Sequence, residues 1–154
     1  EDMLDRVVRD LPTMVAFRTH VENGSMFNTP PVFPIYVLME TLRWLKSIGG
    51  VPEIYRRNKE KAALLYDEID RNPLFRGTVD KQDRSLMNIC FVMADGYEEL
   101  APEFMEFTKG RGIVGIKGHR LVGGFRASCY NALPKESVEV LVECMQEFAA
   151  KHAK

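Results

Sequence analysis

Two arginines and a histidine stand among three glycines in one short stretch, residues 117–128, KGHRLVGGFRAS. Glycine lets backbone N–H groups approach a ligand closely, and the arginine guanidinium is a planar fork of donors that matches carboxylate and phosphate oxygens. His119, Arg120 and Arg126 therefore indicate a site for a small molecule that carries two separated anionic groups. The alternative is that Arg120 and Arg126 form surface ion pairs, each worth well under ~1 kcal/mol.

The dipeptide Asn28-Thr29 is a second candidate for anion binding. It precedes Pro30-Pro31, which read as a helix entry because proline is tolerated in a first helical turn. A side-chain amide, a hydroxyl and a helix start could together bind a phosphate. The alternative is that Asn28 or Thr29 only caps the helix.

Other polar residues suggest no further chemistry. His20 and His152 have no partner at metal-ligand spacing and are predicted at the surface, and no metal site is expected. No Ser/His/Asp or Cys/His arrangement suggests a nucleophile, so no catalytic residue is assigned. The acidic pairs Asp67-Glu68 and Glu98-Glu99 are predicted to face water.

Composition bounds the class of protein. The chain has 154 residues, 45% of them apolar and 28% charged, which is ordinary for a globular domain. The net charge of −1 gives no sign of nucleic-acid binding, and no apolar run approaches the ~20 residues of a membrane span. Cys90, Cys129 and Cys144 are widely spaced, which is typical of reduced thiols in a cytoplasmic protein. The chain opens without methionine, so we expect it to be a piece of something longer.

Several elements must position these residues. Alternation over residues 15–22 predicts an extended segment, and 23–25 reads as a turn. The pattern of residues 35–48 predicts a helix that is apolar almost all round and ends at Gly49-Gly50. Such a helix is buried between two bodies rather than lying on one.

The rest of the sequence, from residue 52 onward, predicts an α+β fold. A helix over 52–69 has an apolar stripe, with its charged residues, Lys61 among them, facing water. Residues 86–93 read as a buried strand, Asp95 could cap the following helix, and 113–116 and 124–130 read as two short strands. Pro134 opens the last helix. The order of strand, helix, strand, strand, helix indicates a small, mainly antiparallel sheet covered by helices.

Three blocks of this sequence resemble the phosphoserine aminotransferase family. Residues 24–31 look like its N-G-S-M-[FY]-N-T-P-P segment, and residues 84–88 match its R-S-x-M-N strand entry. Residues 117–132 match its K-G-H-R-x-x-G-G-x-R-A-S-x-Y-N-A block. The blocks occur in the family's order and spacing and span nearly the whole chain.

The resemblance implies a pyridoxal-phosphate aminotransferase of fold type I, class V, acting in the cytoplasm as a homodimer. Such enzymes move an amino group between glutamate and 3-phosphohydroxypyruvate, giving phosphoserine and 2-oxoglutarate in serine biosynthesis. His119 and Arg120 would bind the substrate phosphate, and Arg126 the α-carboxylate. Asn28 and Thr29 would reach the cofactor phosphate of the other subunit.

One part of the family pattern is missing. Its cofactor is bound by a large N-terminal domain that carries the Schiff-base lysine, and no lysine of this sequence matches that motif. The resemblance therefore implies the C-terminal portion of such an enzyme, not competent alone. Residues 1–49 would be a connecting segment with an interdomain helix, and 50–154 the small domain.

Two other functions remain open from the residues alone. The chain could be a free-standing module that binds a phosphorylated or dicarboxylate metabolite without catalysis. It could also be a structural domain that associates through its apolar helix.

Overall fold

The computed structural model describes residues 2–121 and 123–153, with side chains from Met3 onward. The chain divides into two compact units, Glu1–Trp44 and Leu45–Lys154, which are described separately. Within the described residues, no helix is long and apolar enough to cross a membrane.

The first unit is helical and open. It contains α1 (Asp2–Asp5), the 3-10 turn η1 (Thr13–Val15), α2 (Phe17–Glu22) and most of α3 (Val32–Ser47). None of its described side chains is buried. The apolar side chains of α3 from Val32 to Trp44 are exposed within the chain, with Phe33 74% and Leu38 57% accessible.

The extended segment predicted over residues 15–22 is wrong, because residues 17–22 form α2. Phe17 and Val21 are four residues apart, so an alternating pattern also places them on one helical face. The Asn23 side-chain amide donates to the Thr19 carbonyl at 2.8 Å and closes the helix. The turn expected at 23–25 is confirmed, since Gly24 and Ser25 both have positive φ.

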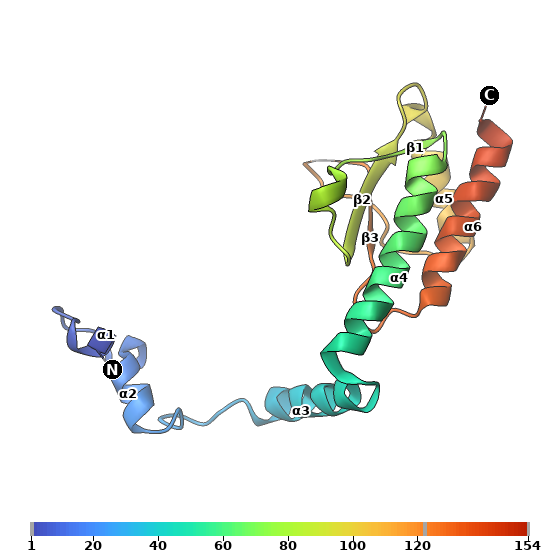
Figure 1. Ribbon diagram of the computed structural model, residues 1–154. Helices are drawn as coiled ribbons and strands as arrows, with labels where there is room; N and C mark the ends of the chain where they lie inside the picture. The colour runs from blue at the N-terminus through green and yellow to red at the C-terminus, as the bar shows by residue number, and fades with distance from the viewer. Residues whose placement is uncertain (1, 122, 154) are drawn as a thin grey trace. The chain divides into compact units, whose positions relative to one another are not determined.

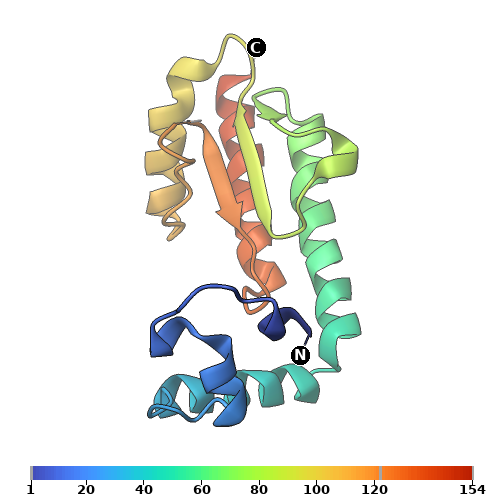
Figure 2. The ribbon, with the colours of Figure 1, turned by 90° about the vertical axis from the view of Figure 1, so that its left-hand side faces the viewer.

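The second unit confirms the predicted α+β class. Its three strands, β1 (Phe75–Gly77), β2 (Asn88–Met93) and β3 (Phe125–Ser128), form an antiparallel sheet in the order β1-β2-β3. Three helices, α4 (Gly50–Arg71), α5 (Ala101–Gly110) and α6 (Lys135–His152), cover one face of this sheet and leave the other open (Figures 1 and 2). Two 3-10 turns, η2 (Lys81–Asp83) and η3 (Glu98–Leu100), lie in the connections.

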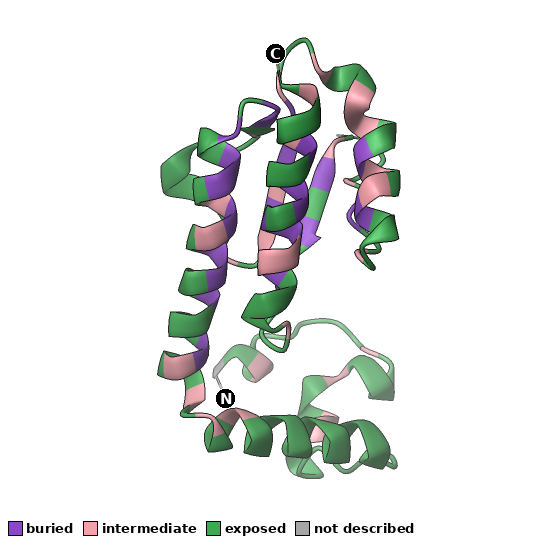
Figure 3. Cartoon of the chain, turned by 90° about the vertical axis from the view of Figure 1, so that its right-hand side faces the viewer, coloured by how far each residue is buried: buried purple, intermediate pink, exposed green. Residues whose placement is uncertain are grey.

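The core lies between the sheet and the helices. Alternate residues of β2 face it, and the buried residues of the helices lie on the sides of the helices that face the sheet (Figure 3). The stripes predicted for α4 and α6 are confirmed as buried: Ile54, Ala62, Leu65 and Ile69, and Val138, Leu141, Val142, Met145 and Phe148. Aromatic rings from five elements meet at its centre: Phe75, Phe91, Phe104, Phe125 and Phe148.

The structure differs from the expectation at three places. β1 was not predicted, because three residues are too few to show an alternation. Residues 113–116 form no strand, since Gly115 has φ of 74° and only the Ile116 carbonyl accepts from the sheet. Asp95 caps no helix: α5 begins at Ala101, and Asp95 instead pairs with Arg76 at 3.3 Å.

Two charged residues that were predicted to face water are buried. Lys61 and Glu68 are each 2% exposed. The carboxylate of Glu68 accepts hydrogen bonds from Arg71 at 2.5 Å, Asn72 at 2.7 Å and Gln146 at 2.9 Å. Burial raises the pKa of Glu68, but these hydrogen bonds outweigh it and lower the pKa overall. A surface helix pattern does not reveal such partners, because Gln146 comes from α6.

Candidate functional site

Arg126 lies on β3, on the face of the sheet that the helices leave open. Phe125 and Ala127 are buried, whereas Arg126 and Ser128 are exposed. The Arg126 backbone N–H donates to the Ile116 carbonyl at 2.8 Å, which holds the strand in place. Among the described residues Arg126 forms no ion pair, so the surface-pair alternative does not account for it. None of its guanidinium donors has a hydrogen-bond partner among the described residues, so the group could bind an anion.

A row of polar side chains lies beside Arg126 on the same face. Asn88 of β2 is the cross-strand partner of Ser128, whose hydroxyl donates to the Asn88 side-chain oxygen at 3.4 Å. The Asn88 amide donates to the Tyr130 hydroxyl at 3.3 Å. These side chains could orient a carboxylate bound by Arg126. No role was predicted for Asn88, Ser128 or Tyr130, although the alternation 126, 128, 130 places Arg126, Ser128 and Tyr130 on one face.

His119 and Arg120 lie in the loop that leads into β3. Two backbone hydrogen bonds close this loop: Gly118 N–H donates to the Gly124 carbonyl at 2.8 Å, and Gly123 N–H to the His119 carbonyl at 2.7 Å. The side chains of His119 and Arg120 are exposed. Arg120 forms no ion pair with any residue that the structure describes, and His119 Nδ1 accepts from the Leu121 N–H at 3.3 Å.

The loop requires glycine at two positions. A Cβ at Gly118 would lie 2.0 Å from the Gly123 carbonyl oxygen. A Cβ at Gly124, whose φ is 63°, would lie 2.7 Å from the Phe91 carbonyl oxygen and 2.6 Å from a methyl of Val92. In the structure these glycines allow the loop's own backbone and β2 to approach closely, and the predicted approach of a ligand to the glycines stays a prediction.

The segment that carries Asn88 is fixed by a second polar cluster. The guanidinium of Arg84 donates to both carboxylate oxygens of Asp70, at 2.9 and 2.6 Å, and stacks 4.5 Å above the Tyr66 ring. The Tyr66 hydroxyl donates to the Ser85 carbonyl at 3.0 Å, and the Ser85 hydroxyl accepts the Asn88 N–H at 3.1 Å. The hydrogen bonds from Arg84 lower the pKa of Asp70 to about 2. This cluster sets where β2 begins.

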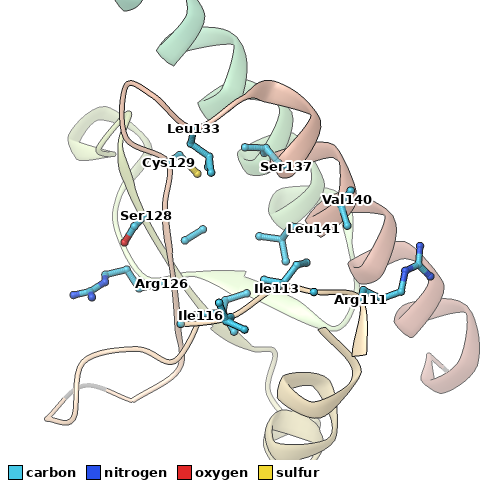
Figure 4. Close-up of a pocket in the computed structure, with 15 residues that line it drawn as sticks. Arg111, Ile113, Ile116, Arg126, Ser128, Cys129, Leu133, Ser137, Val140 and Leu141 are labelled. Carbon is cyan, nitrogen blue, oxygen red and sulfur yellow. The ribbon is translucent and has the colours of Figure 1, made fainter. Parts of the chain in front are cut away.

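A cavity of about 390 Å³ lies behind β3, between residues 111–116 and the first half of α6. Its walls are largely apolar and include Ile113, Ile116 and Leu141. Figure 4 shows that Arg126 and Ser128 project away from this cavity. Arg126 and Ser128 thus belong to the lining of the cavity, but their exposed side chains lie on the open face of the sheet.

Asn28 and Thr29 lie in the first unit, between α2 and α3. Both are exposed. The Pro31 carbonyl accepts the first helical hydrogen bond, from Ile35 N–H at 3.2 Å, so Pro31 occupies the N-cap position. Asn28 and Thr29 precede that position, and the capping alternative does not explain them. Asn28 and Thr29 are neighbours in the sequence and belong to a different unit from Arg126, which shares the open face of the sheet with Asn88, Ser128 and Tyr130.

Within residues 2–121 and 123–153, no three His, Cys, Asp or Glu side chains gather as metal ligands would. His152 is half-buried rather than free at the surface, and its Nε2 lies 3.2 Å from a Glu103 carboxylate oxygen. His20 contacts the Met14 carbonyl at 2.9 Å. Neither histidine belongs to the site.

Comparison with known proteins finds aminotransferases. The sequence profile of the aminotransferase class-V family matches residues 10–141. The phosphoserine aminotransferase of Phocaeicola vulgatus is 62% identical over 152 residues, covering 98% of this chain and 43% of that protein. That of Azobacteroides pseudotrichonymphae is 57% identical over 154 residues, covering 100% of this chain and 43% of that protein. The chain thus spans about two fifths of the length of these relatives.

Solved structures agree with the sequence comparison. The phosphoserine aminotransferase of Bacillus circulans subsp. alkalophilus superposes with a TM-score of 0.89 at 45% identity, over 99% of this chain and 42% of that one. A phosphoserine aminotransferase from Trichomonas vaginalis with bound pyridoxal phosphate gives a TM-score of 0.83 at 42% identity, over 94% of this chain and 41% of that one.

Proposed function

This chain belongs to the class-V aminotransferase family, and we propose that it forms the C-terminal, substrate-binding portion of a phosphoserine aminotransferase. The whole enzyme would transfer the amino group of glutamate to 3-phosphohydroxypyruvate, giving phosphoserine and 2-oxoglutarate for serine biosynthesis. The relatives that match nearly the whole chain are phosphoserine aminotransferases, which supports this substrate class.

The observation that carries the proposal is the unpaired guanidinium of Arg126 on the open face of the sheet. A carboxylate accepts two parallel hydrogen bonds from such a group. The α-carboxylate is common to glutamate and phosphoserine, so one arginine serves both. Ser128 and Asn88, which are linked at 3.4 Å, flank it and would fix the orientation of the bound carboxylate.

His119 and Arg120 would bind the second anionic group of the substrate. A phosphate accepts from both a guanidinium and an imidazole N–H, and both side chains are exposed in the loop before β3. The shorter, singly charged γ-carboxylate of glutamate would use the same residues with fewer contacts. This accounts for two substrates in one site.

Pyridoxal phosphate is the cofactor that the family implies. Asn28 and Thr29 fit its phosphate, because both are exposed and neither side chain has a hydrogen-bond partner in the described part of the chain. When bound, this cofactor supplies the electron sink for amino-group transfer. The chain's own residues would hold its phosphate across a homodimer and orient the substrate's anionic ends.

The roles that we propose for the two parts of the chain depend on the lysines of the sequence. None matches the family's Schiff-base motif, so we propose that residues 1–49 connect to a large cofactor-binding domain and that 50–154 form the small domain. The chain alone would then be inactive. We propose that the whole enzyme is cytoplasmic, because the wide spacing of Cys90, Cys129 and Cys144 is typical of reduced thiols.

The test is Arg126→Ala in a full-length enzyme that contains this sequence. We expect kcat/KM for both glutamate and phosphoserine to fall by about 30-fold or more, since losing a charged bidentate contact costs on the order of 2–5 kcal/mol. The matched control is Arg76→Ala, which removes an arginine from the same open face but from β1, where it pairs with Asp95. Equal effects of the two substitutions would contradict the proposal.

A further inference from the structure

Lys61 is a buried ammonium that no carboxylate pairs with in the described chain. Its Nζ donates to three backbone carbonyls, those of Cys129 at 3.3 Å, Tyr130 at 2.7 Å and Leu133 at 3.0 Å. An ammonium has three N–H donors, so all of them are used. Burial lowers the pKa of Lys61, because desolvation disfavours the charged ammonium.

The three carbonyls belong to one turn, residues 129–133, which connects β3 to α6. The Tyr130 carbonyl also accepts the Leu133 N–H at 3.0 Å, and the Cys129 N–H donates to the Met87 carbonyl at 2.7 Å. The turn is therefore folded so that its oxygens converge. Without a cation at that point, the aligned carbonyl dipoles would repel one another.

A second side chain of α4 contacts the same turn. The Asn58 amide donates to the Asn131 side-chain oxygen at 2.8 Å. Asn58 is three residues before Lys61, so both side chains lie on one face of the helix. Asn58 is 3% exposed, and α4 thus holds the turn at two points from inside the core.

The turn is continuous with the anion-binding face. Ser128 ends β3 immediately before it, and Tyr130 within it accepts the Asn88 amide at 3.3 Å. A shift of residues 129–133 would move Tyr130 relative to Asn88 and would change the path of β3 at Ser128. Arg126 lies two residues before Ser128 on the same rigid strand.

We propose that Lys61 and Asn58 form a clamp that positions the substrate-binding face of β3. This inference rests on the proposed function, because it assigns to Arg126 the substrate carboxylate. Lys61 and Asn58 are positioning residues and touch no substrate. The clamp fixes the geometry in which Arg126, Ser128 and Tyr130 point out together, and it thereby sets substrate affinity rather than the chemical step.

The experiment compares three variants in a full-length enzyme that contains this sequence. Lys61→Met keeps the unbranched stem and removes the ammonium, Asn58→Ala removes the second contact, and Lys59→Met removes an exposed lysine of the same helix as a control. Amide hydrogen exchange is measured over residues 125–133. We expect exchange there to rise about tenfold or more in Lys61→Met, less in Asn58→Ala, and not at all in the control.

Steady-state kinetics supply the functional readout. We expect Lys61→Met to raise KM for glutamate and phosphoserine together by about tenfold, with kcat within about twofold, because a small misplacement of a binding group weakens every substrate that uses it. Unchanged exchange over 125–133 would overturn the clamp. So would a fall in kcat at unchanged KM.

A double-mutant cycle separates positioning from general destabilisation. In the background of Arg126→Lys, where the carboxylate fork is already lost, Lys61→Met should raise KM by less than about threefold. Full additivity of the two changes would overturn the inference. If Lys61→Met gives no folded enzyme, Asn58→Ala enters the same cycle, with the same expected loss of additivity.

The two proposals fail in different ways. If the unmodified full-length enzyme shows no transamination of glutamate, the proposed function is wrong, and with it the assignment of this face to substrate. If transamination is normal and depends on Arg126 but is indifferent to Lys61 and Asn58, only the clamp is wrong.

Discussion

Arg84 and Asp70 meet through two parallel hydrogen bonds, at 2.9 and 2.6 Å, that join the start of β2 to α4. The Arg84 side chain is only 13% exposed, and Lys81 adds a contact to Asp70 at 3.0 Å. Bidentate geometry and partial burial make this pair stronger than the exposed pairs elsewhere on the surface. It anchors the segment that carries Asn88 into the site.

This pair predicts a particular acid sensitivity. The pKa of Asp70 is lowered to about 2 in the folded chain, below its ordinary value of 3.8. A carboxyl group whose pKa is depressed by folding stabilises the fold above its ordinary pKa, and that stability is lost as the pH falls toward the folded value. The free energy of unfolding should therefore decline between about pH 4 and pH 2.

Asp70→Asn should remove that part of the pH dependence and lower stability at pH 7 by about 1–3 kcal/mol, since it leaves a half-buried guanidinium without its charge partner. Denaturant unfolding at several pH values measures both effects. Asp95→Asn, at an exposed pair with Arg76, is the matched control and should change little. A parallel acid profile in Asp70→Asn and the unmodified protein would contradict the prediction.

Arg120→Ala should separate the two substrates of the full-length enzyme. Losing the phosphate contact should lower kcat/KM for phosphoserine strongly, by about 30-fold or more. The effect on glutamate should differ in size, because a γ-carboxylate is smaller and less charged than a phosphate. Equal losses for both substrates would show that Arg120 does not bind the distal anionic group.

The isolated chain should form no single-site covalent adduct with pyridoxal phosphate. A nucleophilic lysine needs a lowered pKa. Burial lowers the pKa of Lys61, but its three donors are all bound to carbonyls inside the core. Lys117, beside the basic loop, is exposed and solvated.

Mixing the chain with stoichiometric pyridoxal phosphate, trapping with borohydride and mapping the labelled lysines checks this expectation. Weak labelling spread over exposed lysines is the expected pattern. A saturable adduct at Lys117 that releases pyridoxamine phosphate with glutamate would show that the chain is competent alone.

The isolated chain should also self-associate through α3. Phe33, Ile35 and Leu38 are exposed on this helix, and a contiguous apolar surface of that kind favours burial against another chain. Leu38→Glu should shift the sedimentation profile toward monomer at high concentration. Gln82→Glu adds the same charge in the exposed η2 turn and should leave the profile unchanged. A clean monomer in the unmodified chain would refute the prediction.

Periodicity predicted the parts of the fold that depend on one element at a time. Val138, Leu141 and Val142 are spaced for one helical face, and they are buried. Lys61 shows the limit of that reasoning. It stands among the charged residues of α4, and its acceptor Cys129 follows 68 positions later. Only tertiary packing brings the two together, so no local pattern distinguishes Lys61 from its solvated neighbours.

The same limit applies to the candidate site, where local patterns indicate some residues and tertiary pairing decides others. His119, Arg120 and Arg126 were predicted as binding residues from residue type and the neighbouring glycines, and that role stays a prediction. Asn88 was not assigned a role, because its place beside Ser128 depends on the register of β2 against β3. Register is set by pairing across the sheet and is not written in either strand alone.

The crowded glycines of the loop before β3 limit which positions could be varied to change substrate selectivity. Gly118 and Gly124 leave no room for even one methyl group, so a library that randomises them would mostly yield disrupted loops. His119, Arg120 and Leu121 project from the same loop and are exposed. Under the proposed function, diversity placed at these three positions should change the size and charge of the group that the enzyme binds, while Gly118 and Gly124 keep the loop intact.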